Sequence, residues 1–193
     1  MTPGCNNSAT NNGHSARMEV LSRLHSYDRH LFAKVFRQGE RRMVIPLARA
    51  LSLSGDGYLH LLIPLVLWQL QLPDVPHFLA LLTLALGLER GLYWSLKNSL
   101  RRPRPQNAIP GLRSFITASD QFSFPSGHSS GAFLLATTLV IIFGGPVLAM
   151  YVWASGVALS RVLLGVHFPG DILAGGIMGS TVALASAALL GGM

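Results

Sequence analysis

Three short polar blocks, set among long apolar stretches, carry residue types suited to phosphate chemistry. Together they supply a lysine, two arginines, a serine, a glycine amide, two histidines and a carboxylate. Cations and amides bind phosphate oxygens, while a neutral imidazole oriented by a carboxylate can attack phosphorus. This set suits a site that grips a phosphate and cleaves it through a histidine, with no metal required. The blocks are Lys97 with Arg104-Pro105, then Pro125-Ser126-Gly127-His128, and then Ser160-Arg161 with His167 and Asp171.

Taken singly, each block also has an ordinary structural explanation. A lysine inside a bilayer costs roughly 2.5–3.5 kcal/mol to insert, which makes Lys97 a functional candidate, although its side chain could simply extend to the lipid headgroups. His128 alone fits an interfacial histidine, and His167 with Asp171 fits an ion pair. The two arginines favour function, because a planar guanidinium binds phosphate through two parallel hydrogen bonds.

The local sequence around the two histidines predicts how each is held. Ser126 is expected to cap a helix whose free N–H groups bind an anion, and Gly127 allows the backbone to approach an oxyanion closely. His167 and Asp171 are four residues apart, which permits a hydrogen bond that sets the imidazole tautomer.

Composition places the chain in a membrane. Half of its 193 residues are hydrophobic and only 12% are charged. Apolar runs approaching about 20 residues are typical of membrane-spanning helices. The expected fold class is therefore all-α, an integral membrane helical bundle. Five spans are predicted, at residues 58–72, about 77–100, 126–144, 146–166 and about 169–193. Since short turns make successive spans alternate in direction, all three blocks should meet at one face of the bilayer.

The region before these spans is polar and basic. Residues 1–16 are rich in Asn, Ser, Gly and Thr and are predicted to be a disordered leader. Residues 17–54 are predicted to form amphipathic or interfacial helices, and residues 55–193 the transmembrane domain. The basic helix at 17–37 fits two arrangements equally well: on the membrane surface, binding anionic lipid headgroups, or packed on the bundle. No nucleic-acid partner is expected, because the positive charge lies in this region and beside the first block.

Two further patterns concern packing. Glu89 lies beside Arg90 in the second predicted span, which predicts a structural ion pair inside the bundle. Gly175, Gly176 and Gly179 predict a close helix contact, either within the chain or between chains.

The three blocks resemble the motifs of the type 2 phosphatidic acid phosphatase superfamily, which also contains bacterial acid phosphatases and vanadium haloperoxidases. The resemblance covers about Lys97 to Asp171, and every motif position matches. It implies that His167 is a nucleophile that forms a phosphohistidine, that Asp171 orients it, and that His128 protonates the leaving group. It implies no metal and no other cofactor. The residues that would hold the phosphate oxygens are Lys97, Arg104, Ser126, Gly127 and Arg161.

The function implied is removal of the terminal phosphate from a membrane lipid phosphate or diphosphate. Undecaprenyl diphosphate, phosphatidic acid, phosphatidylglycerophosphate and a lipid A phosphate all fit, and nothing in the sequence separates them. Two alternatives remain: a lipid phosphotransferase on the same scaffold, and a non-enzymatic membrane-interaction protein that binds through its basic N-terminal helix.

Localisation is expected to be a bacterial inner membrane. Membrane members of the family usually have six spans, and here a basic helix replaces the first. The positive-inside rule would place that helix, and with it the site, in the cytoplasm. Many bacterial relatives instead work on the outer face. Because cations of the site distort the charge count, we expect an extracytoplasmic site.

Overall fold

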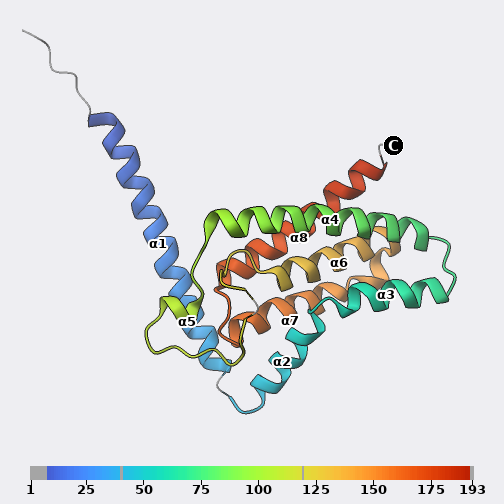
Figure 1. Cartoon of the computed structure of the whole chain (residues 1–193), viewed down its shortest axis with the longest axis horizontal. Coiled ribbons are helices and arrows are strands. Elements are labelled where there is room, and N and C mark those ends of the chain that lie inside the picture. Colours follow the sequence, from blue (N-terminus) through green and yellow to red (C-terminus); the bar gives the residue numbers. More distant parts are fainter. Residues whose placement is uncertain (1–7, 40, 119, 192–193) are drawn as a thin grey trace, which may run out of the picture.

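The chain folds into helices and loops, arranged as Figure 1 shows. The structure is a computed structural model that describes residues 8–39, 41–118 and 120–191, and within this part it describes the side chains of Arg23 and of residues 25 onward. No strand occurs in these ranges, so the predicted all-α class is confirmed. The helices are α1 (Ser8–Gly39), α2 (Val44–Ser54), α3 (Tyr58–Gln69), α4 (Val75–Leu100), α5 (Pro105–Ala108), α6 (Gly127–Phe143), η1 (Gly145–Val147), α7 (Met150–Leu163) and α8 (Pro169–Gly191).

Three helical segments within the described chain are long and apolar enough to cross a bilayer: Val75–Leu100, Gly145–Leu163 and Pro169–Gly191. Helices α2 and α3 meet at a 60° bend and would supply a fourth span as a bent pair. The predicted span at 58–72 is a helix of only 12 residues, about 18 Å long, which is short for a hydrocarbon core of about 30 Å. Helix α6 is apolar, but with 17 residues it is shorter than the three spanning segments. The structure is thus a membrane bundle with three clear spans, to which the bent pair α2–α3 and the shorter apolar helix α6 are added. The helices occur in the predicted order.

Helix α6 lies at the centre of the bundle and contacts α4, α7 and α8. Its residues from Ser129 to Leu139 are almost all buried, which is consistent with an apolar composition on every face. A core of apolar side chains joins it to its neighbours, including Phe78 and Leu82 of α4 and Val182 of α8.

Glycines of α8 allow its backbone to touch that of α6. A Cβ atom added at Gly175 would lie 2.5 Å from the carbonyl oxygen of Ser126, and one at Gly179 would overlap the carbonyl oxygen of Ser130. The predicted glycine contact therefore forms within the chain. Where this helix contact ends, the Ser126 N–H donates a 3.1 Å hydrogen bond to the Asp171 carbonyl. This bond connects the start of α6 to the start of α8.

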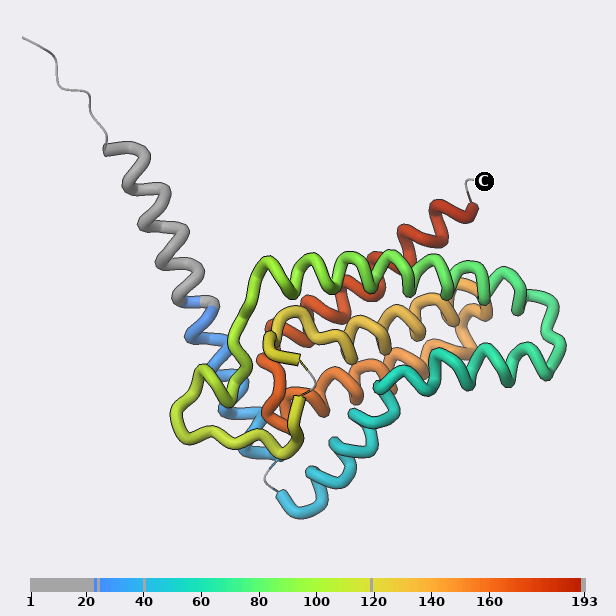
Figure 2. The backbone as a smooth tube through the Cα atoms, viewed as in Figure 1, coloured from blue at the N-terminus to red at the C-terminus, as the bar shows by residue number. Residues whose placement is uncertain are grey.

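The three polar blocks meet at one end of the bundle, as predicted. Figure 2 shows that α4 ends there, α6 begins there, α7 ends there and α8 begins there. Lys97 lies in the last turn of α4, His128 in the first turn of α6, Arg161 in the last turn of α7 and Asp171 in the first turn of α8.

Helix α1 packs on this same end of the bundle. Phe32 and Phe36 are buried against Val162 and Phe168, so this part of α1 adopts the packed arrangement of the two predicted ones. Binding of anionic headgroups by its basic side chains stays a prediction. Residues 1–7 of the predicted leader lie outside the described chain, and α1 begins at Ser8 within that leader.

The glycine contact predicts a stability difference between two alanine substitutions. We expect Gly179→Ala to lower the thermal unfolding midpoint in detergent, because overpacking typically costs about 1–3 kcal/mol. Gly87→Ala in α4 is the matched control, since no atom lies within 4 Å of its added Cβ. Its midpoint should stay or rise, because alanine favours a helix. Equal midpoints for Gly179→Ala and the unsubstituted protein would contradict the close contact of α6 and α8.

Candidate functional site

A cavity of about 680 Å³ opens where the polar blocks meet. Five of the eight predicted site residues line it: Arg104, Gly127, His128, Arg161 and His167. Its other lining residues come from the turn before α3, from α3, α4 and α6, and from the loop after α5: Gly55, Asp56, Gly57, His60, Leu86, Arg90, Tyr93, Asp120 and Gly131.

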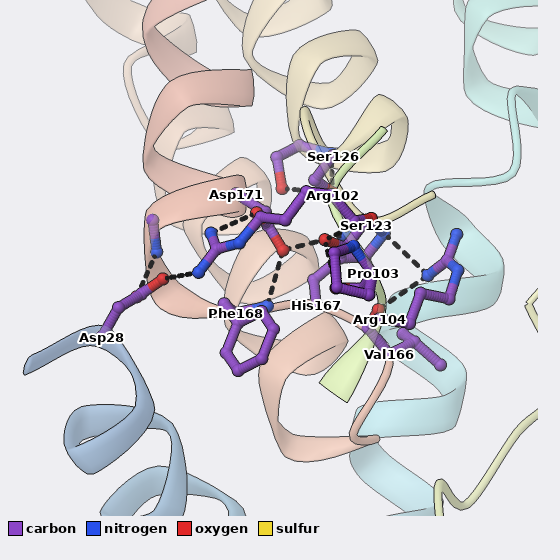
Figure 3. Close-up of polar contacts among 12 residues, drawn as sticks. Asp28, Arg102, Pro103, Arg104, Ser123, Ser126, Val166, His167, Phe168 and Asp171 are labelled. Carbon is purple, nitrogen blue, oxygen red and sulfur yellow. Dashed lines mark hydrogen bonds and ion pairs between the residues drawn. The ribbon is translucent and has the colours of Figure 1, made fainter. Parts of the chain in front are cut away.

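His167 lies in the loop between α7 and α8 with its two nitrogens facing different groups. Its Nδ1 is 3.7 Å from an Asp171 carboxylate oxygen, which is too long for a hydrogen bond, and this nitrogen is buried without another partner among the described residues. Its Nε2 is 3.5 Å from Nη1 of Arg104, and both residues line the cavity. Contacts of this kind are often long in a protein without substrate and shorten in the complex. Nδ1 of His167 faces the Asp171 carboxylate, but the hydrogen bond that the sequence spacing permits is not formed in the structure (Figure 3).

Burial sets the charge state of His167. Loss of water around the charged imidazole lowers the pKa of His167 to about 4, and the nearby Asp171 carboxylate only partly opposes this shift. The imidazole is therefore neutral above about pH 4. A neutral imidazole is the form that can act as a nucleophile or accept a proton.

Asp120 holds two of the predicted phosphate-binding cations. Its carboxylate pairs with Lys97 Nζ and with the Arg104 guanidinium, and it accepts a 2.7 Å hydrogen bond from Tyr93. Arg104 also donates to the carbonyl of Val166 over 2.6 Å. Lys97 is buried behind Tyr93 and Asp120, and its Nζ lies 2.6 Å from the Tyr93 hydroxyl. The carboxylate thus lies between the two cations at the wall of the cavity.

Arg161 and His128 form another part of the wall. Arg161 is buried and donates from Nη1 to the hydroxyl of Ser52 in α2, while its Nε has no partner among the described residues. His128 Nε2 lies 2.5 Å from a carboxylate oxygen of Asp56 in the turn between α2 and α3. A second cavity, of about 420 Å³, shares His128, Arg161 and Asp56 with the first.

Ser126 and Gly127 begin helix α6 as predicted. The Ser126 hydroxyl accepts from the Ser129 N–H over 3.4 Å, which confirms the predicted N-cap. Ser126 is fully buried, and its hydroxyl also accepts from the Ser129 hydroxyl, so its role in phosphate binding stays a prediction. Gly127 faces the ring of Tyr93, where an added Cβ would lie 3.1 Å from a ring carbon.

Sequence reasoning missed the carboxylates that pair with the cations and with His128. Asp120 is the only acidic residue between residues 101 and 124, and Asp56 lies in a glycine turn, so both had a weak local signal. The pairing of Asp28 with Arg102, which in turn pairs with Asp171, had no local signal in the sequence. The Glu89–Arg90 pair was predicted and is confirmed, with distances of 2.7 and 3.0 Å.

Comparison with known proteins extends beyond the motifs. The family model described as the PAP2 superfamily matches residues 78–191, more than half of the chain. Lipid A 4'-phosphatase of Bacteroides thetaiotaomicron is 35% identical over 88 residues, which cover 44% of this chain and 39% of that protein. The chain therefore matches less than half the length of this relative. Decaprenylphosphoryl-5-phosphoribose phosphatase of Mycobacterium tuberculosis is 29% identical over 143 residues, which cover 74% of this chain and 78% of that protein.

A solved structure has the same fold. The crystal structure of Aquifex aeolicus LpxE matches with a TM-score of 0.70 at 24% identity, over 82% of this chain and 93% of that one. The likeness includes most of the helical bundle described here.

The burial of His167 predicts its titration. We expect its imidazole to stay neutral down to about pH 4 and to become charged below that value. The ¹⁵N spectrum of histidine-labelled protein in detergent measures this, with His167→Ala to assign the signals. Titration of His167 near the ordinary histidine value of about 6.5 would contradict the burial described here.

Proposed function

Because this chain belongs to the PAP2 superfamily, we propose that it removes the terminal phosphate of a membrane lipid phosphate or diphosphate through a phosphohistidine and without a metal. The observation that carries the proposal is the cavity of about 680 Å³, which is lined by all four predicted histidines and arginines of the site: His128, His167, Arg104 and Arg161. The two relatives above are named as phosphatases of lipid substrates. Helices suited to crossing a bilayer surround the cavity, which supports a substrate that stays in the membrane.

The orientation of His167 supports its role as nucleophile. Asp171 faces Nδ1 and favours a proton there, which leaves the lone pair of Nε2 on the cavity side beside Arg104. In the first step Nε2 forms a bond to phosphorus as the bond from phosphorus to the lipid oxygen breaks. In the second step water attacks phosphorus, the P–N bond breaks, and inorganic phosphate leaves.

The position of His128 supports a role in transferring the protons of both steps. It lines the same cavity as His167, and it also lines the neighbouring cavity, which gives water a place beside it. In the proposed reaction His128 donates a proton to the leaving lipid oxygen and then takes one from the attacking water. Asp56, 2.5 Å from Nε2, holds the imidazole in place at the cavity wall.

The position of the Asp120 carboxylate supports a binding site for phosphate oxygens between Lys97 and Arg104. It is an anion held between Lys97 and Arg104, and a phosphate bears more negative charge on similar oxygen acceptors. In the proposed complex the phosphate takes its place between these cations, and the unpartnered Nε of Arg161 donates to a further oxygen. Phosphoryl transfer depends mainly on positioning and on stabilising charge, and three cations supply both.

The cavity also has a side suited to a lipid. Beyond the polar blocks it reaches Leu86 and Arg90 of α4 and His60 of α3, on helices whose outer faces expose large apolar side chains. A lipid head can therefore occupy the cavity while its tail lies along α3 and α4. We propose an isoprenyl diphosphate such as undecaprenyl diphosphate, phosphatidic acid, phosphatidylglycerophosphate or a lipid A phosphate as the substrate. A bacterial inner membrane with an extracytoplasmic site is the location proposed with it.

Phosphate release from purified protein tests this proposal. In detergent with excess EDTA, we expect release from at least one of undecaprenyl diphosphate, phosphatidic acid, phosphatidylglycerophosphate and lipid A. His167→Ala should lose roughly 10³-fold or more, because it removes the nucleophile. His77→Ala is the matched control, since this exposed histidine begins α4 at the opposite end of the bundle, and it should keep full activity.

Two results would contradict the proposal. One is equal release by His167→Ala and the unsubstituted protein. The other is loss of release in EDTA with recovery on adding a divalent cation. Release that falls when a second lipid or a sugar is added as acceptor would favour the phosphotransferase alternative.

A further inference from the structure

A chain of ion pairs connects helix α1 to the carboxylate that faces His167. We propose that Asp28 of α1, acting through Arg102, is a positioning residue for Asp171 and thereby for His167. This inference rests on the function proposed above, because it concerns how the nucleophile of that reaction is held. Asp28 precedes residues 78–191, the part of the chain that matches the family model, and Arg102 is not one of the predicted site residues.

Arg102 bridges two carboxylates with its two terminal nitrogens. Nη2 lies 2.5 Å from an Asp28 oxygen, and Nη1 lies 2.7 Å from Oδ1 of Asp171 (Figure 3). Its guanidinium stacks over the ring of Phe168 at 4.4 Å. The side chains of Asp28 and Arg102 are 14% and 19% exposed and that of Asp171 is fully buried, so solvent screens these pairs weakly.

Asp28 also contacts the first turn of α8 directly. Its second oxygen accepts a 2.8 Å hydrogen bond from the Gly170 N–H, next to Asp171 in the sequence. A carboxylate beside the first N–H groups of a helix is favourable, because those groups have no partner within the helix. Asp28 therefore holds both the side chain that contacts Asp171 and the backbone turn that carries it.

The two oxygens of Asp171 have different partners, and Asp28 maintains this division. Oδ1 binds Arg102, while Oδ2 accepts the Phe168 N–H over 2.8 Å and faces Nδ1 of His167. A free guanidinium tends to bind both oxygens of a carboxylate in parallel. Because Asp28 occupies Nη2, Arg102 reaches Asp171 through Nη1 alone, which leaves Oδ2 for His167.

Helix α1 is held firmly enough to serve this role. Phe32 and Phe36, one and two turns after Asp28, are buried against Val162 and Phe168. Phe168 precedes α8 and follows His167 directly, so the same residue packs against α1 and lies beneath Arg102. The N-terminal helix is thus part of the site's support, in addition to any contact that it makes with lipid.

Kinetics of charge-neutral variants test the inference. Asp28→Asn keeps the size of the side chain and an acceptor for Gly170, but it removes the charge that holds Arg102. We expect kcat to fall roughly 10- to 100-fold, because small displacements of a reacting group have effects of this size. KM should stay within about twofold, since Arg104 and Arg161 are untouched. The matched control is Asp74→Asn, an exposed aspartate in the turn before α4, which should match the unsubstituted protein.

Two further variants separate positioning from simple docking of α1. Arg102→Lys keeps a cation but has a single nitrogen, so it should show the same loss of kcat. If Asp28 acts through Arg102, the double variant Asp28→Asn/Arg102→Lys should be no slower than Arg102→Lys alone. Rates are compared well below each thermal unfolding midpoint, so that loss of folded protein does not enter.

A spectroscopic readout distinguishes failure of the inference from failure of the proposed function. The ¹⁵N signal of His167 Nδ1 should shift in Asp28→Asn and stay unchanged in Asp74→Asn. If the unsubstituted protein releases phosphate while Asp28→Asn keeps both its kcat and this signal, the inference is wrong and the function stands. If no lipid is hydrolysed, the function fails, and an unchanged Nδ1 signal in Asp28→Asn would overturn the inference as well.

Discussion

The site depends on the close contact between α6 and α8. Helices in a bilayer gain little from the hydrophobic effect on packing together, so their association relies on van der Waals contact and on small residues that let backbones approach. Gly175 and Gly179 provide this approach against the carbonyls of Ser126 and Ser130. The hydrogen bond from Ser126 N–H to the Asp171 carbonyl then aligns the two helix starts. This alignment puts the helix that carries His128 beside the turn that carries His167 and Asp171.

Four carboxylates from distant parts of the chain keep the charged site stable within a membrane bundle. A buried cation without a partner is costly in a low-dielectric environment. Asp120 pairs with Lys97 and Arg104, Asp28 and Asp171 share Arg102, and Asp56 faces His128. These pairs differ in what a phosphate would do to them. Asp120 lines the cavity, where a bound phosphate would compete with it, whereas Asp28 and Asp171 do not line it and, in the proposal above, position His167.

The sequence predicted the fold class, the helix order and the convergence of the polar blocks, because these follow from apolar run lengths and from the alternation of successive spans. It overestimated the length of α3, which ends at Gln69 before a turn in which Gln71 adopts a left-handed conformation. The bend between α2 and α3 lies at the other end of α3, in the turn at residues 55–57, where Gly57 adopts a left-handed conformation. The sequence analysis also missed the pairs of Asp28 with Arg102 and of Asp120 with Lys97. These join residues far apart in the chain, and a single sequence holds no signal for which distant charges will meet.

The central claim is that His167 carries the phosphate during turnover, and mass spectrometry of quenched reactions tests it most directly. The protein would be mixed with the lipid that it hydrolyses fastest, stopped in alkali during the first turnover, digested and searched for phosphopeptides. The account predicts phosphate on His167, stable in base and lost in acid, that forms no later than inorganic phosphate is released. Steady release of phosphate with no phosphorylated His167 at any quench time, or phosphate found on His128 instead, would contradict it.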